Sequence, residues 1–168
     1  GGMHFFNPVH RMKLLEPVRA LETSDATLQA CEAVGIAMGK ECVTVRESPG
    51  FVTSRINAMI GNEAFYMLQE GVASATDIDK ALKLGLNHPM GPFELVDLVG
   101  LDTRLSMLRF LHRTTGEKLR PCPLMEQDGA AGRLGRRVRP GRCAGGGRAQ
   151  GHVATRPPGA RARGTAAA

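Results

Sequence analysis

No apolar run in the 168-residue sequence approaches the roughly 20 residues that a membrane-spanning helix needs. The first residues also lack the basic and then apolar pattern of a secretory signal. The four cysteines, Cys31, Cys42, Cys122 and Cys143, stand singly, and no two have the short spacing of a zinc or redox motif. These absences argue against secretion, a membrane segment and a metal site, and they predict a soluble protein of the reducing cytoplasm.

Acidic residues become scarce toward the carboxy terminus. Residues 1–120 contain 13 Lys and Arg against 14 Asp and Glu, whereas residues 121–168 contain nine Arg against two acids, so the net charge of +6 comes from the end of the chain. Residues 129–168 hold ten Gly and ten Ala and cannot bury enough apolar surface to order themselves. We therefore expect residues 128–168 to be disordered. This segment lacks the interleaved aromatic residues of a stacking surface, which disfavours nucleic-acid binding.

Residues 13–45 have the pattern of a strand, a helix and a second strand. The segment 13–21 favours a strand, Ser24 or Asp25 can cap the helix, and residues 42–45 favour another strand. The apolar positions of the helix are Leu28, Val34 and Met38. A unit of this size normally makes a right-handed crossover in a parallel sheet. Two strands and one helix leave a sheet edge open, so the unit is expected to belong to a larger sheet.

After Pro49-Gly50 the apolar residues recur with a helical period. Helices are expected over 51–70, 74–85 and 102–116, and Ser74 with an acidic residue three positions later looks like a capping box. The apolar positions of the first helix are Val52, Ile56, Met59, Ile60 and Met67. The proline-rich loop 87–92 favours a stiff connector between helices over a substrate-facing wall. This part of the chain is therefore predicted to be an all-α module.

The opening segment GGMHFFNPVHRMKLLE places His4 among two phenylalanines and an Asn-Pro turn. Glu16 lies twelve residues later, in an expected strand that could return beside His4. A carboxylate that accepts a hydrogen bond from one ring nitrogen fixes the tautomer and leaves the other nitrogen free as a base. From these residues alone, a packed structural histidine is the more common alternative. Glu16 can equally be a solvated edge group or a partner of Lys13.

Ser54 and Asn57 lie three residues apart near the start of the first expected helix, on nearly the same face. They can contact a substrate through a hydroxyl and an amide, or they can be ordinary polar residues of a helix surface. No histidine of this chain has a companion at metal-ligand spacing, so no metal site is expected.

Three long blocks carry a resemblance to a known family. They are HFFNPVHRMKLLE, ESPGFVTSRINAMIGNEA and DIDKALKLGLNHPMGPFELVDLVGLD. In order and spacing they resemble the 3-hydroxyacyl-CoA dehydrogenases, including the bacterial 3-hydroxybutyryl-CoA members, over about residues 1–127. The resemblance implies an α+β fold that is a remnant of a larger enzyme, with the end of a parallel sheet followed by helices. Residues 1–48 would end a Rossmann-type NAD-binding domain, and residues 49–127 would form a helical domain like the carboxy-terminal domain of 6-phosphogluconate dehydrogenase.

The resemblance also implies a reaction and its residues. His4 would be the base that removes the 3-hydroxyl proton of (S)-3-hydroxyacyl-CoA while a hydride passes to NAD, which gives 3-oxoacyl-CoA in fatty-acid or short-chain acyl-CoA metabolism. Glu16 would be the partner of this base. Ser54 and Asn57 would bind the acyl-CoA substrate, and the helical domain would form a homodimer.

The sequence departs from the family pattern in three places. Ser54 stands where many members have an asparagine. There is no GxGxxG turn for the NAD pyrophosphate, so no cofactor-binding residue is assigned, and we expect a truncated chain that is inactive alone. After GRLGRR, the family's Ser/Thr-Gly run is replaced by VRPGRCAGGGRAQ, which indicates a frameshift near Arg137. The alternative function is a non-catalytic helical dimerisation or interaction module.

Overall fold

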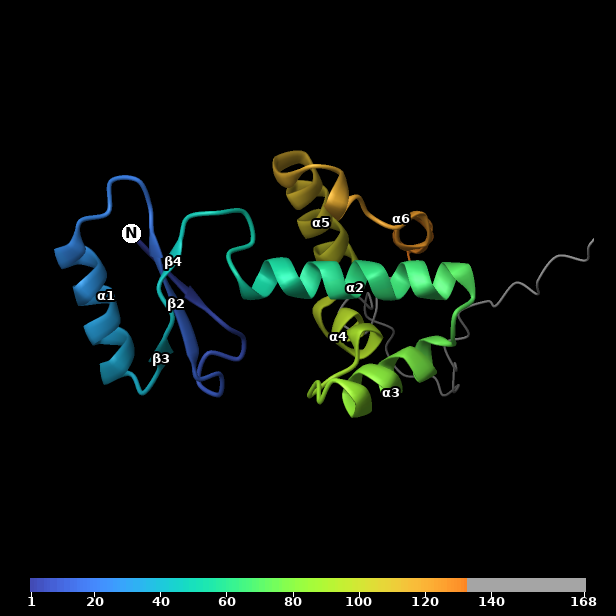
Figure 1. The fold of residues 1–168 in the computed structure, drawn as a ribbon, viewed down its shortest axis with the longest axis horizontal. Helices are drawn as coiled ribbons and strands as arrows, with labels where there is room; N and C mark the ends of the chain where they lie inside the picture. The colour runs from blue at the N-terminus through green and yellow to red at the C-terminus, as the bar shows by residue number, and fades with distance from the viewer. Residues whose placement is uncertain (133–168) are drawn as a thin grey trace, which may run out of the picture.

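The computed structural model describes residues 1–132, which form a small sheet with one helix and a set of packed helices (Figure 1). The sheet part contains β1 (Gly2–Phe5), β2 (Leu14–Arg19), α1 (Asp25–Ala37), β3 (Glu41–Cys42) and β4 (Val45–Arg46). The helical part contains α2 (Thr53–Glu70), α3 (Ala75–Gly85), α4 (Pro92–Val99), α5 (Leu101–Thr115), the 3-10 helix η1 (Glu117–Leu119) and α6 (Pro123–Ala130). The expected order of a sheet remnant and then helices is confirmed. Of the segment 128–168 that was expected to be disordered, residues 128–130 belong to α6. Its remainder from residue 133 and the expected frameshift lie outside the described part.

Strand β2 is the central strand of the sheet. It pairs antiparallel with β1 and parallel with β3 and β4, so the predicted strand-helix-strand unit with parallel strands is confirmed. The expected strand at 42–45 is divided in two, because β3 pairs with the start of β2 and β4 pairs with its end. Within residues 1–132, no helix is long and apolar enough to cross a membrane.

Helix α1 approaches the sheet through a glycine. A Cβ on Gly35 would lie 2.5 Å from Cys42 Sγ and 2.6 Å from a methyl carbon of Leu15, so glycine permits this close approach. Of the three apolar positions of the predicted helix, Leu28 is buried, whereas Val34 and Met38 are about half exposed. The helix turns its glycine, and not the larger residue beside it, toward the strands.

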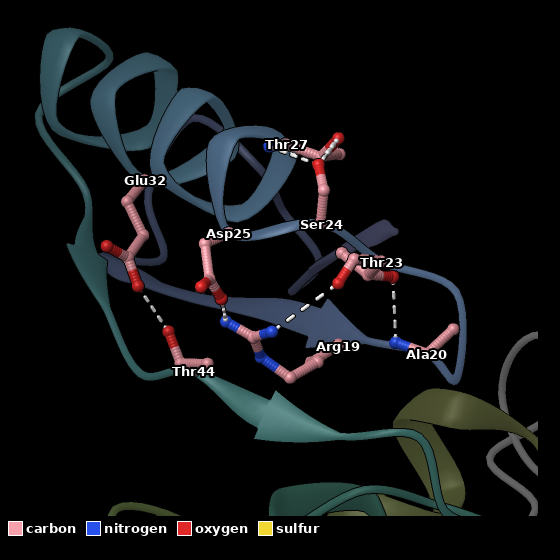
Figure 2. A network of polar contacts seen from close by, with 8 residues as sticks. All are labelled: Arg19, Ala20, Thr23, Ser24, Asp25, Thr27, Glu32 and Thr44. Carbon is pink, nitrogen blue, oxygen red and sulfur yellow. Dashed lines mark hydrogen bonds and ion pairs between the residues drawn. The ribbon is translucent and has the colours of Figure 1, made fainter.

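Polar contacts orient α1 on the sheet (Figure 2). Arg19 at the end of β2 donates to Asp25 Oδ1 at 2.6 Å and to the Thr23 carbonyl at 3.4 Å. Farther along the helix, the Thr44 hydroxyl donates to Glu32. The ionic partners are largely exposed, so these contacts add little to the free energy of unfolding. The predicted cap by Ser24 is present, and its hydroxyl oxygen accepts from the Thr27 amide.

Four leucines of α5 form the centre of the helical part. Leu101, Leu105, Leu108 and Leu111 are all buried, as their helical spacing predicts. The remaining buried members of this core are Ala58, Phe65, Val96, Leu119, Cys122 and Met125. In the view of Figure 1, α2 runs across this part of the molecule, with α5 and α6 on one side of it and α3 and α4 on the other. The three predicted helices correspond to α2, α3 and α5.

Helix α2 buries a different face from the one that its large apolar residues predict. Its buried residues are Ala58, Gly61, Asn62, Ala64 and Phe65. Val52, Ile56 and Met59 are instead 54%, 52% and 40% exposed. Small residues on the buried face let the other helices come close. The three exposed residues, spaced four and three positions apart, form a row that we call the α2 stripe.

A buried asparagine holds the segment that leads into α6. The Asn62 amide donates to the Arg120 carbonyl at 2.8 Å, and its oxygen accepts from the Cys122 amide at 2.8 Å. Sequence patterns did not reveal α6, which continues to Ala130, three residues beyond the expected end of the helical domain. Met125 in this helix is fully buried, and this packing explains the extension.

A carboxylate from α3 caps helix α4. Asp79 is buried and accepts hydrogen bonds from the Phe93 and Glu94 amides at 2.8 and 3.1 Å. Burial raises the pKa of Asp79 above its usual range, while these two bonds oppose that shift. The loop 87–92 thus leads into the first turn of α4, which Asp79 of α3 holds in place. This agrees with the expected role of the loop as a connector between helices.

We predict that Gly91→Ala lowers the free energy of unfolding by about 1–3 kcal/mol. A Cβ at this position would lie 2.3 to 2.4 Å from atoms of the Asp79 side chain and would displace the cap of α4. Gly85→Ala is the matched control, because nothing lies within 4 Å of a Cβ there, and alanine should stabilise this end of α3. Urea denaturation measures both variants. An equal effect of the two substitutions would contradict the prediction.

Candidate functional site

His4 and Glu16 face each other across two antiparallel strands. They are register partners in the β1–β2 pairing, and His4 Nδ1 lies 2.7 Å from Glu16 Oε2. The structure therefore brings together the two residues that the sequence singled out. The expectation that His4 sits on a turn was wrong, because His4 belongs to β1 and the Asn7-Pro8 bond follows the strand. A strand position fixes the imidazole opposite its partner more firmly than a turn would.

The Glu16 carboxylate is bonded on both of its oxygens. Its side chain is 1% exposed, and Oε1 accepts from the Thr53 amide at 3.3 Å and the Thr53 hydroxyl at 3.2 Å. Thr53 is the first residue of α2, and the preceding Val52 has no side chain that can cap the helix. Glu16 therefore satisfies a free amide at the start of α2 and places its negative charge at the positive end of the helix dipole.

Two aromatic rings flank the imidazole. The ring centre of His4 lies 4.7 Å from that of Phe6 and 5.2 Å from that of Phe51. Phe51 follows Gly50, and both have a positive φ, so this turn directs the phenylalanine ring to the histidine. The His4 side chain keeps 28% of its surface exposed.

This arrangement sets the role of each ring nitrogen. An ionised carboxylate only accepts hydrogen bonds, so Nδ1 donates to Glu16 and Nε2 carries the lone pair. The exposed remainder of the ring leaves the imidazole accessible from outside, and a histidine of this tautomer can take or return a proton. The pair can thus act as a general base and acid at a partly apolar surface.

Sequence reasoning missed Thr53 and Phe51 as parts of this site. Both belong to the ESPGFVTSR segment, in which only Ser54 had been considered. The available signal was the Pro-Gly break followed directly by a helix, since the first turn of a helix presents free amides. The partner of those amides could not be read from the sequence, because Glu16 lies 37 residues earlier.

The two expected substrate contacts lie on α2 in different surroundings. Ser54 is half buried and directly follows Thr53, so it starts the helix beside the His4–Glu16 pair. Asn57 is exposed and lines a small recess of about 20 Å³. The other residues of this recess are Ile60, Gly61, His88, Met90, Pro92, Leu95 and Arg104. None of His4, Glu16 and Ser54 lines it.

The described residues contain no cluster of three or more His, Cys, Asp or Glu that could hold a metal ion. They also contain no GxGxxG turn of the kind that binds a dinucleotide pyrophosphate. The chemistry that the His4–Glu16 pair itself offers is proton transfer by one oriented imidazole.

We predict that Glu16→Gln lowers the free energy of unfolding by about 1–3 kcal/mol. The amide has only one oxygen, so its NH2 group must face the donors of either Thr53 or His4. Glu22→Gln is the matched control, because Glu22 is exposed at the turn before α1. Denaturant titrations at neutral pH compare the two. A Glu16→Gln protein as stable as the control would contradict the assigned hydrogen bonds.

Two family models match the chain in succession. The NAD binding domain of 3-hydroxyacyl-CoA dehydrogenase matches residues 1–48, and the carboxy-terminal domain of the same enzyme matches residues 50–142. The chain belongs to the 3-hydroxyacyl-CoA dehydrogenase family, as its sequence blocks indicated.

Individual relatives agree with this assignment. A probable 3-hydroxybutyryl-CoA dehydrogenase of Bacillus subtilis is 49% identical over 137 residues, which cover 81% of this chain and 48% of the relative. The human mitochondrial hydroxyacyl-coenzyme A dehydrogenase is 38% identical over 139 residues, covering 82% of this chain and 44% of the relative. The crystal structure of the (S)-3-hydroxybutyryl-CoA dehydrogenase from Ralstonia eutropha is 50% identical with a TM-score of 0.78, covering 81% and 48% of the two chains. The chain thus spans about half the length of these relatives.

Proposed function

We propose that this chain supplies the acid-base half of an enzyme that oxidises (S)-3-hydroxyacyl-CoA to 3-oxoacyl-CoA with NAD. The observation that carries the proposal is the 2.7 Å contact between His4 and a fully bonded, buried Glu16 in a member of this family. We divide the chain into the end of an NAD-binding domain at 1–48, a helical domain that begins at 49 and extends through α6 to Ala130, and a tail after it. The names of the relatives support an acyl-CoA substrate, and a role in fatty-acid or short-chain acyl-CoA metabolism follows from that substrate.

In the proposed reaction, Nε2 of His4 takes the proton of the substrate 3-hydroxyl group as C3 loses its hydride. NAD supplies the hydride acceptor when it is bound. Glu16 holds the imidazole in the required tautomer and stabilises the imidazolium that forms. Thr53 and the α2 terminus in turn hold Glu16. In the reverse direction, His4 returns the proton to the 3-oxo oxygen.

Ser54 is proposed to contact the substrate from the first turn of α2. It stands where many members of the family have an asparagine, and it is shorter, so its hydroxyl needs a bridging water or a closer acyl-CoA. Asn57 is proposed as a second, weaker contact one turn farther along the helix. The free thiols of Cys31, Cys42 and Cys122 in the described part support a reducing compartment such as the cytoplasm.

The α2 stripe supports a homodimer through the helical domain. Val52, Ile56 and Met59 form an exposed apolar row on the longest helix of the described part. Such a row on a helix that already packs on its other face is typical of a surface that another protein covers. A dimer would also serve the alternative function, a non-catalytic interaction module, and activity distinguishes the two.

We predict that the chain alone does not oxidise 3-hydroxybutyryl-CoA, but that a chimaera does. In the chimaera, the part of the Ralstonia eutropha enzyme that precedes the matched region is joined to Gly1. His4→Ala should lower its kcat by about 10²–10⁴-fold, because a positioned base contributes that much. Glu16→Gln should cause a smaller loss, since the base remains but is less well oriented. NADH absorbance follows the reaction.

The exposed His10 gives the matched control for this series, because it lies in the same half of the molecule as His4 and outside the described pair. His10→Ala should leave kcat within about twofold of the unmodified chimaera. NAD binding and circular dichroism show that each variant is folded. A folded, NAD-binding chimaera in which His4→Ala keeps full activity would disprove the assignment of the base.

For the dimer, we predict that the chain sediments at twice its monomer mass at micromolar concentration and that Ile56→Lys dissociates it. A lysine in an apolar interface must give up its hydration, which costs several kcal/mol. Ile36→Lys is the control, because Ile36 is an exposed apolar residue on α1 and not on the stripe. A strictly monomeric wild type, or equal dissociation by both variants, would exclude the stripe as the interface.

A further inference from the structure

Arg104 is a buried cation in the middle of the helical part. It is the fourth residue of α5, and only 4% of its surface is exposed. Its Nε would lie 3.9 Å from a Cβ placed on Gly61 of α2, as would a methyl carbon of Val96 in α4. The arginine therefore lies where α2, α4 and α5 meet. A Cβ at Gly61 would make only ordinary van der Waals contact with the arginine.

The guanidinium of Arg104 lacks a counter-charge among residues 1–132. Its Nε is fully buried and has no hydrogen-bond partner there. No ion pair found between described side chains includes this arginine. Burial lowers its pKa from the usual range, but an arginine keeps its proton in proteins. An isolated buried charge is strongly destabilising, and an unsatisfied donor adds to that cost.

The recess beside Arg104 contains polar side chains but no carboxylate. Arg104 lines it together with the Asn57 side chain from α2 and His88 from the loop before α4. Its other lining residues are Ile60, Gly61, Met90, Pro92 and Leu95, so no carboxylate lines it. The cavity measures about 20 Å³, which admits one group of the size of a water molecule or a halide ion.

We propose that this recess, lined by Arg104, Asn57 and His88, is a binding site for one small monovalent anion of halide size. A water molecule in the recess would leave the positive charge of Arg104 uncompensated, whereas an anion there would balance it. Larger anions, such as sulfate or gluconate, exceed the volume. The bound ion would join α2, α4 and α5 and would therefore stabilise the helical domain, independently of any activity.

The first test is thermal unfolding of the full chain in sodium chloride and in sodium gluconate at equal ionic strength. The midpoint of the wild type should be about 2–5 °C higher in chloride, because a ligand that binds only the folded state raises it. In Arg104→Met the chloride effect should vanish. Arg109→Met is the matched control, because Arg109 is an exposed α5 residue that pairs with Glu126, and it should keep the effect. No chloride effect in the wild type, or an equal effect in Arg104→Met, would overturn the proposal.

A second measurement does not depend on any variant folding. Crystals of the wild type grown in sodium bromide should give an anomalous diffraction peak in the recess lined by Arg104, Asn57 and His88. The same crystals should give no peak at that place when gluconate replaces bromide. An ordered recess without a bromide peak, or with only a water molecule, would overturn the proposal.

Discussion

A buried carboxylate needs hydrogen-bond donors on both of its oxygens, and Glu16 finds them in two segments that lie far apart in the sequence. His4 comes from the neighbouring strand, and Thr53 comes from the start of α2. If either donor were withdrawn, the other would lose its fixed partner, because a carboxylate with a free buried oxygen would move toward water. The same group therefore sets the imidazole orientation and anchors the first helix of the helical domain to the sheet. The hydrogen bonds of Glu16 therefore determine both the geometry of the candidate site and the junction between the sheet part and the helical part.

Glycines and alanines let the backbones of neighbouring elements approach closely, and these contacts position the elements around Glu16. Gly35 lets α1 lie on β2 and β3, and Gly91 admits the Asp79 carboxylate that caps α4. On α2, the buried face includes two alanines and Gly61 beside Asn62 and Phe65, whereas Ile56 and Met59 are exposed. Tight contacts of this kind fix the direction of α2 and thus the position of Thr53 relative to Glu16. The helical domain thus contributes to the site by orienting the start of α2, where Thr53 donates to Glu16.

The sequence predicted the order of the elements and the candidate pair, but not the geometry that joins them. Periodicity located α2, α3 and α5, because leucines and capping residues mark these helices directly. Several apolar positions that the pattern marks on α1 and α2 are exposed, since periodicity gives weight to large apolar residues and none to glycine or alanine. The family blocks indicated His4 and Glu16. Their contacts with Thr53 and Phe51 depend on long-range packing, which no local pattern encodes.

Glu16 and Arg104 are buried charges of opposite sign, and they differ in the partners that surround them. The glutamate is satisfied by three donors from within the chain and is tied to a helix terminus that favours its charge. The arginine enters the core beside a glycine, with an amide and an imidazole as the other polar groups of its recess. Neither the Asn57 amide nor the His88 imidazole can replace a carboxylate as counter-ion, because neither carries a negative charge. In the proposal made above, the missing charge comes from outside the helices, and the small volume of the recess restricts it to a single atom or a group of similar size.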